Sequence, residues 1–328
     1  MFNLLPLIQN ETLKIWKKKR FYVILLILSV LIPVFTYAQL KIAQNNAEKF
    51  TDWRNQLLQQ IADYENALSS DRIPEEWKKY RRIMVQQLTY YLENDVNPNS
   101  PNAVTFTRRF MDNSVTLFIP LLVLAVASDL VSGERSTGTI KMLLTRPVRR
   151  WKVLCSKLAA LTIYVSLTIV ASVVLCYIIS GLFFGYEGWT LPVFTGFIIN
   201  GSEVDSTYVH AVPQWFYLIM QSGLIWFSAM TVALLAFMVS VLVRSTAASI
   251  VTMMATIIAG TILSNMASSW HNAKYFFAVN LQLNGYLDGS PPPIEGMNLP
   301  FSIGVLSIWA ALALIISFGV FTKQDILN

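Results

Sequence analysis

Cysteine and histidine are scarce in this chain of 328 residues, which contains two of each. Cys155 and Cys176 fall in one predicted helix, where they would lie about 30 Å apart, far beyond disulfide reach. A disulfide-stapled secreted scaffold is therefore excluded, and both cysteines are interpreted as packing residues. His210 and His271 occur in separate segments outside any His-Glu-x-x-His motif, so we expect no metal site.

Charged residues are also few. They make up 13% of the chain, against about 25% in a typical soluble domain, while 54% of residues are hydrophobic and the mean hydropathy is +0.49. A single buried core cannot hold so much apolar surface, and six segments of about 18 or more residues carry almost no charge. The composition excludes an ordinary cytosolic enzyme and a nucleic-acid-binding module. It predicts an all-α membrane protein with six transmembrane helices.

Two catalytic motifs are missing from the sequence. There is no Gly-x-x-x-x-Gly-Lys-Ser/Thr loop to cradle a nucleotide, and no Gly-x-Ser-x-Gly turn to present a nucleophile. We therefore expect no catalytic residue, no cofactor and no enzymatic activity in this chain. The predicted spans hold one charged residue, Asp129, whereas ion-coupled carriers often need carboxylates near the membrane midplane. This scarcity favours an energy source outside the chain.

The six spans are predicted where the apolar runs lie, and the basic residues beside them predict their orientation. Lysine and arginine concentrate in residues 1–20, 132–157 and 322–328 and at Arg244, whereas the short loops 184–214 and 268–300 contain only Lys274. The positive-inside rule then places both termini in the cytoplasm, in a cell membrane that we expect to be a bacterial plasma membrane. The predicted spans are Phe21–Gln39, Ser114–Val131, Leu158–Phe183, Trp215–Val243, Ala247–Ala267 and Phe301–Phe321.

Residues 40–113 form a long and nearly neutral segment, which the rule allows to cross to the extracellular side. Apolar residues recur at helical spacing from Trp53 to Leu68 and again from Ile73 to Tyr91, and Pro74 lies at the break between the two runs. The pattern predicts an extracellular helical hairpin. Its role is left open between packing on itself or on a second subunit and acting as a capture or exit lid.

Residues 1–20 predict an amphipathic helix that lies in the cytoplasmic interface and enters the first span through a bend. Its basic residues, like those at Arg146, Arg149 and Arg150, are interpreted first as contacts to anionic membrane lipids. The apolar residues that share one broad side of this helix are Phe2, Leu4, Leu5, Ile8, Leu13, Ile15 and Trp16.

The segment 132–157, between the second and third spans, is the most unusual part of the chain. Ser132 and Gly133 are interpreted as ending one helix, and Ser136 or Thr137 as capping a short apolar helix that Pro147 stops. Apolar side chains on a cytoplasmic loop need cover from lipid headgroups or from a protein partner. We therefore expect a contact with one of these.

The string GERSTGTIKMLLTRPVRRWK, residues 133–152, followed by Ser156-Lys157-Leu158, resembles the signature of ABC-2 type transporter permeases. The six-span layout, the N-terminal amphipathic helix and the C-terminal Phe321–Ile326 segment also resemble that family. The insertion at 40–113 is larger than in its compact drug-exporter members, which leaves the substrate class open.

The resemblance implies an exporter permease that pairs with a second copy or a related permease and binds separate cytoplasmic ABC ATPase subunits. Those subunits would supply ATP and Mg²⁺, and no nucleic acid is involved. The alternatives are a secondary transporter and a non-transporting membrane sensor or assembly protein. For Glu134 itself the alternative role is a carboxylate facing a helix dipole. The residues that would couple to the ATPase are Gly133, Glu134, Arg135, Gly138, Thr139, Ile140, Met142, Leu143 and Leu144.

Overall fold

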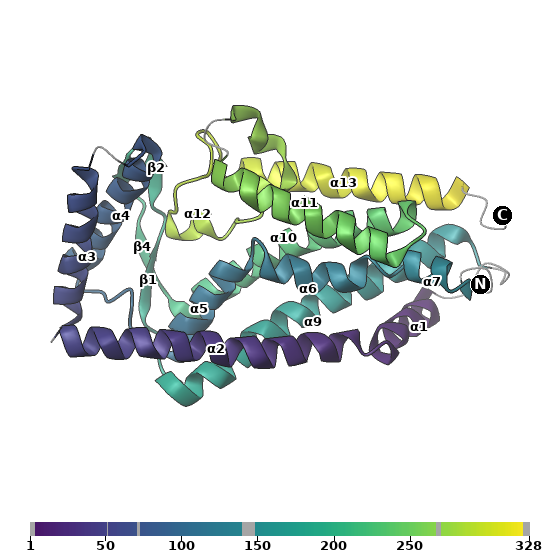
Figure 1. Cartoon of the computed structure of the whole chain (residues 1–328), viewed down its shortest axis with the longest axis horizontal. Coiled ribbons are helices and arrows are strands. Elements are labelled where there is room, and N and C mark those ends of the chain that lie inside the picture. Colours follow the sequence, from purple (N-terminus) through teal and green to yellow (C-terminus); the bar gives the residue numbers. More distant parts are fainter. Residues whose placement is uncertain (1–3, 51, 71–72, 140–147, 267–269, 324–328) are drawn as a thin grey trace.

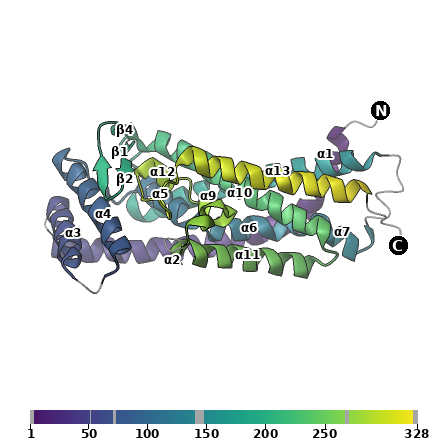
Figure 2. The same cartoon turned by 90° about the horizontal axis from the view of Figure 1, so that it is seen from above.

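The computed structural model describes residues 4–50, 52–70, 73–139, 148–266 and 270–323. Long helices run side by side along one direction, with both chain ends near one end of the bundle and α3 and α4 at the other (Figure 1). Figure 2, turned by 90°, shows the same separation. We call these the termini end and the hairpin end. The main helices are α1 Leu4–Lys17, α2 Arg20–Lys49, α3 Trp53–Leu68, α4 Glu75–Glu93, α5 Ala103–Ser114, α6 Phe118–Ala127, α7 Ser132–Ser136, α9 Arg150–Phe184, α10 Gln214–Leu242, α11 Thr246–Met266 and α13 Leu299–Lys323.

Five of the described helices are long and apolar enough to cross a membrane: α2, α9, α10, α11 and α13. The chain is therefore a multi-pass membrane protein. A sixth crossing would be a broken one, made of Ala103–Ser114 and Phe118–Ser136, which are bent by 63°. The structure does not have one continuous helix over the predicted span 114–131, because α5 ends at Ser114 and α6 begins at Phe118. Asn102 starts α5 by accepting a hydrogen bond from the Thr105 backbone N–H at 2.8 Å, and Pro120 lies in the first turn of α6, where proline is tolerated.

The broken pair also changes the distribution of charge. Asp129 was predicted to be the only charged residue of the spans, yet α5 carries Arg108, Arg109 and Asp112. A crossing made of this pair would therefore hold charged residues besides Asp129.

Two helices extend beyond their predicted limits. α2 continues from the predicted end at Gln39 to Lys49, and α9 begins at Arg150 instead of Leu158. At 1.5 Å per residue α2 is about 45 Å long and α9 about 52 Å, against roughly 30 Å for the hydrocarbon core of a bilayer. Both helices therefore project beyond the lipid, and the outer part of α2 leads directly into the hairpin.

Two helices, α3 and α4, stand where the sequence predicts a helical hairpin, separated by residues 69–74. The loop predicted at 184–214 contains four short strands that the sequence analysis does not predict. β1 (Pro192–Thr195) pairs antiparallel with β4 (His210–Pro213), and β2 (Ile198–Asn200) with β3 (Glu203–Asp205). The loop at 268–300 holds two 3-10 helices, His271–Tyr275 and Phe277–Asn280, and the turn α12 (Gly285–Asp288).

The helix α10 forms the centre of the bundle. In its most apolar window 67% of residues are buried, against 22–33% in the other four spanning helices. Ile225, Val232 and Phe237 are fully enclosed in the main hydrophobic core. The helices α9, α11 and α13 pack directly against α10, and α2 packs against α9. These four helices turn much of their apolar surface outward, where lipid covers it.

Candidate functional site

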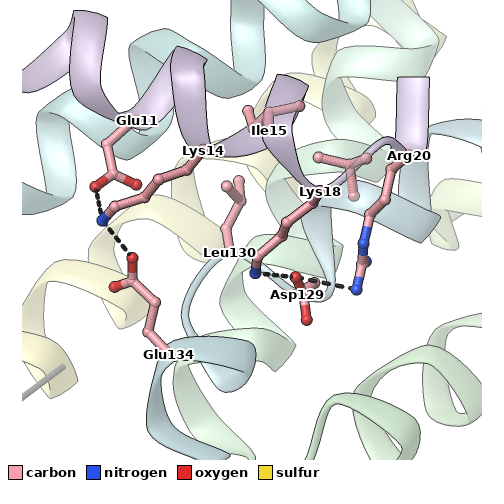
Figure 3. Close-up of a pocket in the computed structure, with 9 residues that line it drawn as sticks. Glu11, Lys14, Ile15, Lys18, Arg20, Asp129, Leu130 and Glu134 are labelled. Atoms are coloured by element: carbon pink, nitrogen blue, oxygen red, sulfur yellow. Dashed lines mark hydrogen bonds and ion pairs between the residues drawn. The ribbon is translucent and has the colours of Figure 1, made fainter. Parts of the chain in front are cut away.

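The site lies at the termini end, where α1 crosses the base of the bundle beside α7 and the first turns of α9. Charged side chains of residues 11–20 point toward Asp129 and Glu134 (Figure 3), and Lys157 of α9 pairs with Glu11 and Glu134. They form two groups. The lysine cluster consists of Glu11, Lys14, Glu134 and Lys157, and the Asp129 cluster consists of Lys18, Arg20 and Asp129.

Lys157 is the centre of the lysine cluster, and its side chain is 0% exposed. Its ammonium Nζ lies 2.8 Å from Glu11 Oε2 and 2.8 Å from Glu134 Oε2, and it donates a 3.0 Å hydrogen bond to the Leu130 carbonyl. Two of its donor positions are thus taken by hydrogen bonds to Glu11 and Leu130, and the Glu134 carboxylate lies at ion-pair distance. An uncompensated charge at this depth would be very unfavourable, so the two carboxylates are needed for Lys157 to be buried.

Lys14 closes the cluster from the solvent side. Its Nζ lies 2.7 Å from Glu11 Oε1 and 2.7 Å from Glu134 Oε1, and its side chain is 36% exposed. Partial burial acts to lower the pKa of Lys14, but the hydrogen bonds to Glu11 and Glu134 outweigh that effect and raise it above its ordinary value. The cluster therefore contains two ammonium groups and two carboxylates and is electrically neutral.

The Asp129 cluster lies beside the bend between α1 and α2. Lys18 Nζ lies 2.6 Å from Asp129 Oδ2, and Arg20 Nη2 lies 3.0 Å from the same oxygen. Arg20 also donates a hydrogen bond to the Ala125 carbonyl. Lys19, between the two cations, has the left-handed φ of 56° that turns the chain from α1 into α2. The predicted bend is confirmed, and an ion-pair cluster fixes it.

Gly133 makes room for the Asp129 carboxylate. A Cβ atom at this position would come within 2.2 Å of Asp129 Oδ1 and 2.7 Å of its Cγ, distances that side chains do not tolerate. Asp129 also accepts a hydrogen bond from Thr246 Oγ1 at 3.2 Å, which joins it to the first turn of α11. A glycine is therefore required for this carboxylate to reach α1, α2 and α11 together.

The backbone around α7 is tied to the central helix as well. Ser240 Oγ, near the end of α10, accepts from the backbone N–H groups of Val131 at 3.1 Å and Ser132 at 2.9 Å. The Arg135 guanidinium donates to the Val241 carbonyl at 2.6 Å. This short segment is thus connected to α1, α9, α10 and α11 at once.

The structure divides the predicted coupling residues into three groups. Gly133 and Glu134 are buried and Arg135 is half-buried, whereas Gly138 and Thr139 are exposed. Ile140, Met142, Leu143 and Leu144 lie outside the described residues. Ser132 and Gly133 begin α7, so their predicted role in ending a helix is wrong: the preceding helix ends at Ala127.

Two functional residues escaped the sequence analysis. Glu11 lies within the predicted amphipathic helix, but its burial is visible only once α9 is placed beside it. Lys157 was counted among the basic residues that set the orientation. In the sequence it stands in the Ser156-Lys157-Leu158 part of the permease resemblance and beside the apolar run that starts at Leu158, and neither feature predicts its burial.

A second polar group lies toward the hairpin end. Asn284 donates a hydrogen bond to Asp112 Oδ1, and the Arg108 guanidinium lies 5.3 Å from the ring centre of Tyr217. Asp288 accepts from the backbone and hydroxyl of Ser290 at 3.0 and 2.7 Å, and burial raises the pKa of its carboxyl group. Among the described residues, no group of three or more His, Cys, Asp or Glu side chains is arranged to hold a metal ion.

Comparison with known proteins gives a family and two relatives. The chain is 26% identical over 327 residues to "Uncharacterized protein YhcI" of Bacillus subtilis (strain 168). The matched region covers 99% of this chain and 100% of that protein. It is also 26% identical over 219 residues to "Uncharacterized membrane protein YdbK" of the same organism, covering 65% of this chain and 80% of the relative. A sequence model of the DUF2705 family matches residues 78–327, well over half of the chain. This chain therefore belongs to DUF2705, a protein family of unknown function.

Proposed function

We propose that this protein is the permease subunit of an ABC-2 type exporter, driven by ATP that separate subunits hydrolyse. The observation that carries the proposal is the lysine cluster, in which buried Lys157 joins α1 and α7 to the base of α9. The sequence supports it in two ways: residues 133–152 resemble the permease signature, and the chain contains no phosphate-binding loop.

The connections of α7 explain how the coupling would work. A force applied at the exposed residues 136–139 reaches α7, which is ion-paired to α1 and α9 and hydrogen-bonded to α10. Rigid helices joined in this way move as one body, and the closure of an ATPase dimer beneath them would shift several spans together. Glu134 acts inside this unit as a positioning residue. The contact with the ATPase belongs to the exposed surface that follows it.

The proposal includes orientation and partners. The termini end faces the cytoplasm of a bacterial plasma membrane, as the distribution of lysine and arginine favours. A second copy of the chain, or a related permease, completes the translocation path, and the ATPase subunits contribute ATP and Mg²⁺. Arg146, Arg149 and Arg150 are assigned to anionic lipid headgroups.

The coupling surface can be tested with Thr139→Arg. Thr139 is exposed, so a larger charged side chain leaves the fold intact but obstructs docking. We expect this variant to insert normally and to lose most transport-linked ATP hydrolysis. Ala247→Arg is the matched control, because Ala247 is exposed at the start of α11 near the same end of the bundle. Equal ATP hydrolysis in the two variants would contradict the docking assignment.

One observation favours an ion-coupled carrier as a second candidate. Asp112 and Arg108 lie on α5, within the broken helix pair, and Asp112 is bonded to Asn284. A carboxyl group in that position could bind a proton or a cation. Substrate flux that follows an ion gradient in proteoliposomes without ATP would support this candidate, and flux that requires the ATPase would reject it.

A further inference from the structure

A large cleft opens at the hairpin end, on the side of the bundle opposite α13. It has a volume of about 900 Å³ and is lined by residues of the outer half of α2, the start of α3, the linker 97–102 and α5. Sites for small organic ligands typically have volumes of about 300–1,000 Å³. The cleft is therefore large enough to hold a ligand.

The cleft is apolar at one end and polar at the other. Leu31, Phe35 and Phe118 line the part that lies within the predicted spans, and Phe35 contacts Phe110 with a ring-centre distance of 6.0 Å. Asn46 and other amides line the opposite part, beside the linker to α5. An amphiphilic molecule has the same division between its chain and its head.

The cleft also lies at the depth where the membrane ends. Counted from Arg20, Phe35 is about 23 Å along α2 and Asn46 about 39 Å, while the hydrocarbon core is roughly 30 Å thick. Phe35 and Ile42 line the cleft and are 52% and 51% exposed. A lipid in the hairpin-side leaflet can therefore reach the cleft from the membrane, with its headgroup at the level of the amides.

The charge of the cleft selects the headgroup. Its lining contains one cation, Arg109, and one anion, Asp52. Asp52 is already paired with Arg54 at 3.1 Å. Arg109 donates to the Pro98 carbonyl and the Asn99 side-chain oxygen, and in the described part of the chain no carboxylate lies within 4 Å of it. The half-buried guanidinium thus has only neutral partners, and an anion would compensate its charge.

We propose that this cleft binds an anionic single-chain amphiphile from the membrane, with its chain against Phe35 and Phe118 and its anionic head at Arg109. Guanidinium groups bind phosphate and carboxylate oxygens through paired hydrogen bonds, which suits either headgroup. This binding requires no ATPase, so the inference extends beyond the proposed function and stands or fails separately from it.

Native mass spectrometry of the full chain in dodecyl maltoside tests the proposal. The probe is oleoyl lysophosphatidylglycerol, and monooleoylglycerol has the same chain without the phosphate. We expect one tightly bound lysophosphatidylglycerol and binding of monooleoylglycerol about 10-fold weaker, since a charge-assisted hydrogen-bonded contact is lost. Inorganic phosphate at the same concentration should not displace the lipid. Equal binding of the two lipids would overturn the proposal, and so would displacement by phosphate, which would indicate a simple anion site.

Variants locate the binding within the cleft. Arg109→Gln should weaken lysophosphatidylglycerol about 10-fold and leave monooleoylglycerol unchanged, whereas Lys41→Gln, which removes an exposed cation outside the lining, should change neither. Ala43→Trp fills the cleft and should weaken both lipids, while Val34→Trp on the exposed side of α2 is its control. Unchanged binding in Arg109→Gln, or equal losses in the two tryptophan variants, would refute the assignment. If Arg109→Gln fails to fold, the comparison of the two lipids on the wild-type chain decides.

Discussion

Replacing Lys157 by methionine is the most direct test of the lysine cluster. Methionine has a similar length and no charge, so the substitution keeps most of the volume and removes only the ammonium group. Glu11 and Glu134 would then share a single cation, Lys14, and the cluster would change from neutral to a net negative charge inside the protein. We expect a large loss of stability, because removing one partner leaves a buried charge uncompensated.

The size of the loss follows from burial. Breaking a fully buried ion pair in this way lowers the free energy of unfolding by about 3–5 kcal/mol, and Lys157 is 0% exposed. For a chain of this length that corresponds to a decrease in Tm of roughly 4–7 °C. Lys14→Met removes the same charge at a position that is 36% exposed, so solvent screening limits its effect to about 1 kcal/mol.

The assay is thermal unfolding of the purified protein in one detergent, followed by intrinsic fluorescence. A double variant supplies the internal control: Lys157→Met with Glu134→Gln restores a neutral cluster and should recover part of the loss. A Tm of Lys157→Met within about 2 °C of wild type would refute the reasoning. A larger loss in Lys14→Met than in Lys157→Met would refute it too.

Two further predictions concern Gly133 and Asp288. Gly133→Ala should destabilise the protein by about 1–3 kcal/mol, because the added Cβ would displace the Asp129 carboxylate. Gly223→Ala is the control and should be close to neutral, because a Cβ atom there would enter open space. Tm measurements on the two variants test the difference. Burial raises the pKa of the Asp288 carboxyl group in the folded state above its ordinary value of about 3.8. As the pH rises, the unfolded chain therefore loses the carboxyl proton before the folded chain does. The free energy of unfolding then falls between pH 3.8 and the pKa of Asp288 in the folded state. Asp288→Asn should remove that dependence, and its Tm advantage over wild type should grow from pH 4 to pH 8. An advantage that is constant with pH would contradict this explanation.

Much of the architecture could be predicted because length and hydropathy act locally. A continuous apolar run predicts a spanning helix whatever its neighbours are, and the helical spacing from Trp53 to Leu68 predicts α3 in the same way. The sequence does not predict the break before α6, because residues 115–127 carry no charge to interrupt the run and the bend depends on how α5 packs. Strands of three and four residues, such as β2 and β1, are too short to show an alternating pattern.

The candidate site could be predicted only in part. The sequence identified the segment around Glu134 because its composition is unusual for a loop. The partners of Glu134 come from α1 and α9, and no local pattern reveals that Lys14 and Lys157 meet at one carboxylate. The same limit applies to Arg109, whose lack of a carboxylate partner becomes visible only when the linker and α2 surround it.

The central claim is that a separate ATPase drives this membrane protein, and one measurement tests it most directly. The tagged chain would be purified from its native membrane in a mild detergent, with identification of every co-purifying chain and an assay of ATP hydrolysis. The account predicts an ABC ATPase subunit in about a 1:1 ratio to this chain, with ATP hydrolysis that depends on the complex. A preparation that stays folded and carries no nucleotide-binding partner, before and after cross-linking in the membrane, would contradict it.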